Sequence, residues 1–213
     1  MATRTFTPVG NSLLNGKTGG TEEDILTGEM EEEMSYFGNV FTSSQGEKTS
    51  EVFKDLDVVC LFFAAKSSPP CRIFTPVLKE FYNEVNMLGK VFEIILVSRD
   101  SQKEDFEEFL PLMPWVAYQF DDEKIMEFKK QFKISAIPTL VVLTDTGELV
   151  TMAGRDDVVL VGEDCFENWK KIALEKKEKA LQEQIMEEEG EDGKEGTKEQ
   201  TGEGTKEATG TTR

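Results

Sequence analysis

The sequence predicts an α/β fold in which a mixed central sheet carries helices on both faces, giving three layers. The first observation is a continuous apolar run, Val58–Ala65, whose length and composition are typical of a strand buried on both faces. A second such run covers 91–97. Between them, apolar residues recur at helical spacing, at Phe74, Val77, Leu78, Phe81, Val85 and Leu88. Strand, helix and strand in this order predict two parallel strands joined by a right-handed crossover.

The elements that follow complete the sheet and its helical layers. Apolar residues return at helical spacing over 106–113, 125–132 and 166–173. Two short apolar runs flank an Asp-Thr-Gly turn within 140–152, which predicts an antiparallel hairpin. The chain is therefore expected to alternate strands and helices first and to close the sheet with the hairpin.

Charge and composition divide the chain into three parts. Residues 1–35 are acidic and contain few apolar anchors, and we expect a disordered tail. Residues 36–175 hold the patterned segments and are expected to form the single folded domain. Residues 176–213 begin as a mostly charged helix extension and end in the near-repeat EGTKEQT and EGTKEAT, which predicts a second disordered, low-complexity tail.

The overall composition excludes several classes of function. The 213 residues include 42 acidic against 24 basic side chains, a net charge of −18, which predicts no nucleic-acid and no membrane partner. Histidine is absent, which excludes Cys–His and Ser–His catalysis and most zinc sites, so we expect no metal and no cofactor. Three widely spaced cysteines favour a reducing compartment, and we expect a cytoplasmic protein.

The candidate site is the stretch AAKSSPPCRIFTP, residues 64–76, where the first strand ends and the first helix begins. In open α/β sheets the ligand site lies beyond the carboxyl ends of the strands, so this loop is at the expected edge. Ser68 is a favoured N-cap residue, and we expect its hydroxyl to accept a hydrogen bond from the amide of Cys71. Prolines are tolerated at the first helical positions, which Pro69 and Pro70 occupy here.

Several motifs carry a resemblance to the thioredoxin superfamily, specifically to its tryparedoxin and nucleoredoxin branch. They fall at matching spacings and in the same order: Pro69-Pro70-Cys71-Arg72, Phe74-Thr75-Pro76, Phe81-Tyr82, Met113-Pro114-Trp115 and Ile137-Pro138-Thr139. The segment Cys165–Trp169 resembles the short nucleoredoxin-like proteins more than tryparedoxin. The resemblance implies a thioredoxin-like fold and membership of a family of protein-disulfide reductases.

The resemblance also shows where this chain departs from the family. The family's site reads Trp-Cys-Pro-Pro-Cys-Arg, whereas Ser67 and Ser68 stand here for the tryptophan and the first cysteine. The site is thus a degenerate Ser-Pro-Pro-Cys, with Cys71 as the one candidate thiol. The resemblance further implies a cis bond before Pro138 and a substrate-binding edge formed by Ile137, Pro138 and Pro70.

The substitution at Ser68 decides the predicted chemistry. A dithiol reductase needs a first thiolate that attacks and a second thiol that resolves the mixed disulfide. An alcohol without an adjacent base cannot replace that thiolate. Two readings of Cys71 stay open: the helix N-terminus, Lys66 and Arg72 all favour its thiolate, whereas without a partner thiol it is an inherited, half-buried small residue of ordinary reactivity. Of the other two cysteines, Cys60 is expected in the core, and nothing places Cys165 near Cys71.

Three functions follow from these observations. The favoured hypothesis is a redox-degenerate protein-binding or regulatory module, with protein or peptide clients at the edge formed by Cys71 and Pro138. The alternative is a monothiol reductase using Cys71, with glutathione or a thioredoxin-type reductant completing its cycle. A redox sensor or a chaperone-like holdase is the third reading.

Overall fold

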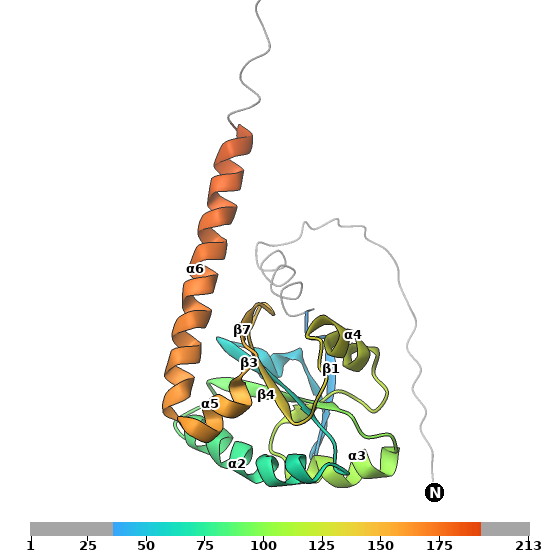
Figure 1. Cartoon of the computed structure of the whole chain (residues 1–213). Coiled ribbons are helices and arrows are strands. Elements are labelled where there is room, and N and C mark those ends of the chain that lie inside the picture. The colour runs from blue at the N-terminus through green and yellow to red at the C-terminus, as the bar shows by residue number, and fades with distance from the viewer. Residues whose placement is uncertain (1–35, 193–213) are drawn as a thin grey trace, which may run out of the picture.

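The computed structural model describes residues 36–192, and they form a sheet covered by helices on both faces (Figure 1). The strand order is β2-β1-β5-β4-β3-β6-β7. The strands are β1 (Val40–Ser43), β2 (Gly46–Thr49), β3 (Val58–Ala64), β4 (Phe92–Ser98), β5 (Val116–Ala117), β6 (Thr139–Thr144) and β7 (Leu149–Thr151). The α-helices are α2 (Pro69–Val85), α3 (Lys103–Phe109), α4 (Glu123–Gln131), α5 (Gly154–Leu160) and α6 (Asp164–Asp192), with 3₁₀ turns η1 (Ser50–Phe53) and η2 (Leu110–Leu112).

The centre of the sheet is the pair β3 and β4, in which every residue is buried. The two strands are parallel, with Ala64 opposite Ser98, and α2 is the crossover between them. On its other side β3 pairs with β6 in the antiparallel sense, with Phe63 opposite Thr139. Both the predicted parallel pair and the predicted antiparallel hairpin of β6 and β7 are confirmed.

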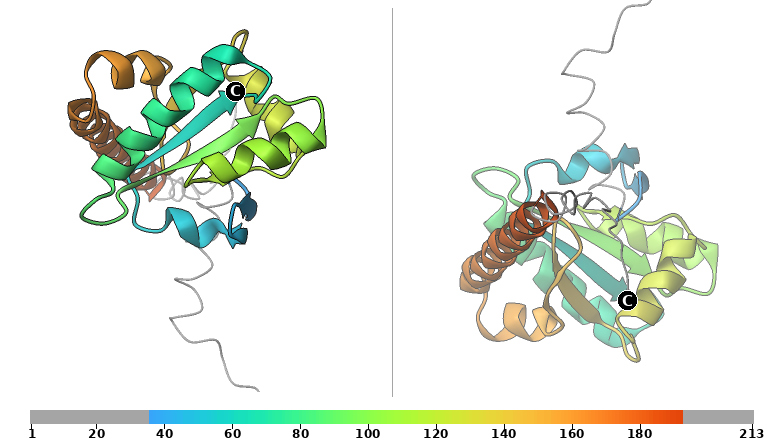
Figure 2. Two further views of the ribbon diagram at one scale, coloured as in Figure 1. Left: turned by 90° about the horizontal axis from the view of Figure 1, so that it is seen from below. Right: turned by 90° about the horizontal axis from the view of Figure 1, so that it is seen from above.

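Two apolar layers enclose the sheet because successive side chains of a strand point to opposite faces. Along β3, Cys60 and Phe62 face the layer formed with α2, α3, α5 and α6. Val59, Leu61 and Phe63 face the layer formed with η1 and α4. Figure 2 shows the sheet between these two sets of helices. The predicted three-layer α/β architecture is confirmed.

Several short elements were not predicted from the sequence. The β1–β2 hairpin pairs Val40 with Thr49 and adds two strands at one edge, and β5 joins this hairpin to β4. The hairpin alternates poorly, and Phe41 is its one fully buried side chain. The short helix α5 was also missed, because much of its apolar content is exposed, as at Leu160.

The last helix continues far beyond the body of the domain (Figure 1). Its first half is anchored by Phe166, Trp169 and Ala173, and then by Lys177, whose ammonium lies 3.2 Å from Asp57 and 2.7 Å from Asp145. None of the helices in the described part of the chain has the length and apolar character needed to cross a membrane. The tails predicted to be disordered lie outside the described residues, apart from the helical stretch up to 192.

Candidate functional site

The candidate site lies at the end of the sheet where the central strands β3 and β4 finish and β6 begins. The amide of Arg99, directly after β4, donates to the carbonyl of Ala64 at the end of β3 (2.8 Å). Because Phe63 is paired with Thr139, Pro138 lies at the same edge, next to the loop that leads to Ser68. The register of three strands therefore gathers the motif residues that the sequence singled out.

Cys71 lies in the first turn of α2, and its side chain is 0% exposed. It belongs to the apolar cluster that also contains Phe62, Phe74 and Leu78. The hydroxyl of Thr75 donates to the carbonyl of Cys71 (2.8 Å), one helical turn on. The thiol that the sequence left open is thus enclosed in the core rather than presented to solvent.

Ser68 occupies the N-cap position of α2, with φ −86° and ψ 114°, but its hydroxyl makes no capping hydrogen bond. The predicted bond from the Cys71 amide to this hydroxyl is therefore wrong. Pro69 and Pro70 have no N–H, so two of the donors that a helix start leaves unpaired are absent here. The Ser68 backbone accepts from the amide of Arg72 (3.2 Å) and so begins the helix without its side chain.

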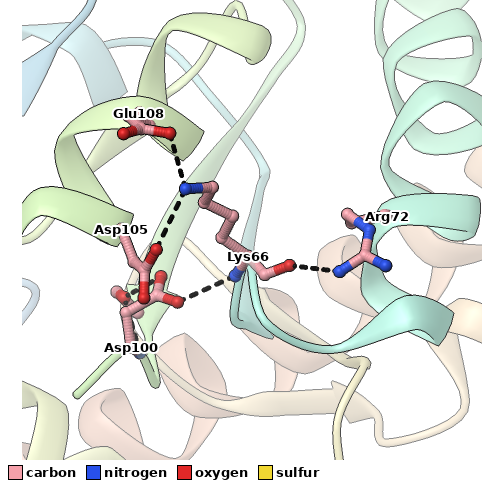
Figure 3. A network of polar contacts seen from close by, with 6 residues as sticks. Lys66, Arg72, Asp100, Asp105 and Glu108 are labelled. Atoms are coloured by element: carbon pink, nitrogen blue, oxygen red, sulfur yellow. Dashed lines mark hydrogen bonds and ion pairs between the residues drawn. The ribbon is translucent and has the colours of Figure 1, made fainter. Parts of the chain in front are cut away.

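Lys66 is directed toward Asp105 and Glu108 on α3 (Figure 3). Its ammonium donates to Asp105 (2.9 Å) and to Glu108, and these two hydrogen bonds raise the pKa of Lys66. The guanidinium of Arg72 donates to the backbone carbonyl of Lys66 (2.9 Å). Both cations therefore hold the loop through these hydrogen bonds.

Asp100 fastens the loop to the end of β4 (Figure 3). One carboxylate oxygen accepts from the amide of Lys66 (2.8 Å), and the other accepts from the hydroxyl of Ser98 (3.0 Å). Burial raises the pKa of Asp100, against the hydrogen bonds that lower it. Sequence reasoning missed this residue, although its position two residues after a buried parallel strand is a signal for the functional end of the sheet.

The segment before β6 supplies the backbone of the candidate binding edge. The Ile137–Pro138 peptide bond is cis, and the hydroxyl of Thr139 donates to the carbonyl of Ala136 (2.8 Å). Ile137 and Pro138 are half-buried, and Pro70 on the neighbouring helix start is exposed. Ile137 packs against both apolar layers, including the cluster that holds Cys71.

The other two cysteines lie inside the layer beneath α2 and α6. Cys60 on β3 and Cys165 at the start of α6 are both buried, and all three cysteines are free thiols. Burial raises the pKa of Cys165 to about 12 and raises that of Cys60 well above its usual range, with a further rise from the nearby Cys165 thiol. Both groups are therefore neutral thiols at physiological pH.

Comparisons with known proteins agree with this geometry. A family model described as thioredoxin-like matches residues 55–149. Tryparedoxin of Trypanosoma brucei brucei is 42% identical over 103 residues, which cover 47% of this chain and 71% of that protein. Nucleoredoxin-like protein 1 of Homo sapiens is 32% identical over 133 residues, covering 58% of this chain and 63% of its own.

A solved structure of tryparedoxin from Trypanosoma brucei superposes with a TM-score of 0.57 at 31% identity, covering 64% of this chain and 97% of that one. The larger nucleoredoxins match over a small part of their length: the chain spans 19% of a plant nucleoredoxin and 25% of the mouse protein. Motif order, sheet topology and coverage lead to one assignment. The chain belongs to the thioredoxin-like family that includes the tryparedoxins and nucleoredoxins.

Proposed function

We propose that this chain is a thioredoxin-fold protein-binding or regulatory module that has lost dithiol turnover. One observation carries the proposal: a serine, Ser68, stands at the position of the attacking thiol, while the remaining thiol, Cys71, is fully buried. The scaffold around them is complete, from the loop fastened by Asp100 to the backbone at Pro138. The clients are proteins or peptides that bind along the exposed and half-buried residues Pro70, Ile137 and Pro138, and the buried Cys71 lies beneath them without contributing to the surface.

The lost chemistry follows from the electron balance of disulfide exchange. A thiolate must attack one substrate sulfur, which releases the other substrate sulfur and forms a mixed disulfide; a second protein thiol then attacks the first and releases the bound substrate sulfur. The alcohol of Ser68 stays protonated at pH 7, and with no histidine in the chain it has no customary base to activate it. The first step therefore has no nucleophile at this position.

A monothiol reductase using Cys71 is the second candidate, with glutathione or a thioredoxin-type reductant as its partner. The burial of Cys71 argues against a monothiol reductase, because the Cys71 sulfur must reach a substrate disulfide to react. Cys60 and Cys165 are buried elsewhere in the same layer and are free thiols. Free thiols are typical of a reducing compartment, and we therefore propose a cytoplasmic location. No contact among the described residues favours the sensor or holdase reading.

The test is disulfide-reductase turnover on a model protein substrate, with dithiothreitol as electron donor. We expect the protein as it stands to be inert and Ser68→Cys to gain turnover. In that variant the introduced thiol attacks the substrate disulfide and releases one substrate thiolate. The Cys71 thiol then displaces the second substrate sulfur, and dithiothreitol reduces the disulfide that results.

Two further variants make the outcome decisive. Ser67→Trp combined with Ser68→Cys restores both family residues at the site. If this double variant folds but is inert, the proposal that the scaffold is intact is contradicted. Turnover by the unmodified protein that disappears in Cys71→Ser would favour the monothiol reductase instead. Cys71→Ala serves as the control should a buried hydroxyl unfold the serine variant.

A further inference from the structure

A surface pocket of about 270 Å³ adjoins the candidate binding edge at Ile137. Its lining includes two cationic side chains and no acidic one: Arg99, Lys129, Ile134, Ser135, Ala136 and Ile137. The chain as a whole carries a net charge of −18. A pocket with two cations beside the edge is therefore opposite in sign to most of the molecule.

Both cations are placed by the fold. Arg99 directly follows β4, and its amide is bonded to Ala64 at the end of β3 (2.8 Å). Lys129 lies in the last turn of α4, and its carbonyl accepts from the amide of Ile134 (2.9 Å). The pocket thus lies between the end of a central strand and the segment that leads into Pro138.

The two cations have no acidic partner among residues 36–192. Neither forms an ion pair there, and the Arg99 guanidinium donates its one side-chain hydrogen bond within that range to the sulfur of Met126 (3.8 Å). A neighbouring pocket that shares Arg99 is lined by three aspartates, two of which are engaged: Asp100 with the loop and Asp122 with the amide of Lys124 (2.9 Å). The third, Asp121, is exposed.

We propose that the pocket formed by Arg99 and Lys129 receives the carboxylate of an acidic side chain on an extended peptide bound along Ile137 and Pro138. A guanidinium matches a carboxylate in shape and charge, and a lysine beside it adds a second donor. Extended peptides gain affinity from main-chain hydrogen bonds and specificity from pockets for individual side chains. The inference rests on the proposed peptide-binding function and assigns its substrate class.

The test is a binding array of immobilised nonapeptides on an alternating Thr-Val background, with aspartate, asparagine or lysine placed at each position in turn. The full-length protein should bind the best aspartate peptide about fivefold more tightly than its asparagine counterpart, the scale of one partly exposed ion pair. Arg99→Gln and Lys129→Gln should each remove most of that preference. Lys130→Gln is the matched control, since Lys130 is exposed on the same helix and does not line the pocket.

Each outcome has a distinct meaning. Peptides that bind without a preference for aspartate, or a preference that survives in the double variant of Arg99 and Lys129, would overturn the pocket assignment and leave the binding module standing. No binding to any peptide would overturn both. Competition by free glutathione that depends on Arg99 would identify a small peptide thiol as the source of the carboxylate instead of a protein segment.

Discussion

The two ends of the central sheet use similar ionic contacts for different purposes. At the end where β3 finishes, Asp100 and Lys66 hold an exposed loop that carries the candidate site. At the end where β3 begins, Lys177 bridges Asp57 and Asp145 and holds α6 against the sheet. Under the proposed function, the chemistry at the first end is altered at Ser68 while the contacts that support the loop are kept. That proposal makes scaffold and reactivity separable in this fold.

Among substitutions at the two ends of the sheet, Asp100→Ala is expected to have the largest effect. The substitution removes the acceptor for the Lys66 amide and for the Ser98 hydroxyl, and we expect the free energy of unfolding to fall by about 1–2 kcal/mol. Introduced beside Ser68→Cys, it should also lower the gained reductase turnover, because the loop loses its fastening. Urea denaturation and the reductase assay measure the two effects, and unchanged turnover would show that the loop needs no such support.

A smaller effect is expected from Lys177→Met at the opposite end. Exposed and partly exposed ion pairs contribute about 0.2–1 kcal/mol, and Lys177 has two partners. Burial lowers the pKa of Lys177, but Asp145 and Asp57 outweigh it and raise that pKa. The stabilisation should therefore be complete below the ordinary lysine pKa, and it should be lost as the pH rises through the higher pKa of the folded state. Peptide binding and the turnover gained by Ser68→Cys should not change.

Lys179→Met provides the control for this prediction. Lys179 pairs with Glu183 on the exposed surface of the same helix and touches neither aspartate. The urea midpoint of the Lys179→Met variant should match that of the unmodified protein. A loss of peptide binding in Lys177→Met, measured on the same array, would contradict the separation of the two ends.

The smallest expected effect concerns Glu93, whose side chain is buried and forms an ion pair with Lys90 (2.6 Å). Burial raises the pKa of Glu93 above its ordinary value, so the unfolded chain ionises first as the pH rises. Stability contributed by this residue should fall between the unfolded and the folded pKa. Glu93→Gln should flatten that part of the stability profile, as followed by thermal unfolding from pH 4 to 8. A steeper profile in the variant would contradict the burial account.

The buried core of the fold could be predicted because its residues are apolar in uninterrupted or helical patterns. Strands β3 and β4 and helix α2 are of this kind. The β1–β2 hairpin could not, since most of its side chains are polar and its place in the sheet is set by pairing with β5 from a distant part of the sequence. The start of α5 is set by packing: a Cβ at Gly154 would lie 2.8 Å from the carbonyl oxygen of Leu140, so the helix approaches β6 where glycine allows it.

The candidate site likewise contains features that the sequence could predict and features that it could not. Motif spacing located Ser68, Cys71 and Pro138, because each lies on a segment whose neighbours are recognisable. The engagement of Lys66 and the part played by Asp100 depend on α3 and β4 lying beside the loop, which no local pattern specifies. The burial of Cys71 likewise depends on an apolar cluster whose other members include Phe62 on β3 and Phe106 on α3, far from it in the sequence.

The projecting α6 also makes the protein convenient to attach to a surface. Lys177 marks the end of the sheet opposite Ser68, about 20 Å away along the seven residues of β3. The helix then continues from Lys177 to Asp192, a further rise of about 22 Å at 1.5 Å per residue. A surface anchor attached at the end of α6 is thus separated by a helical spacer from any ligand at the opposite end of the sheet, and it can hold the protein without obstructing that end.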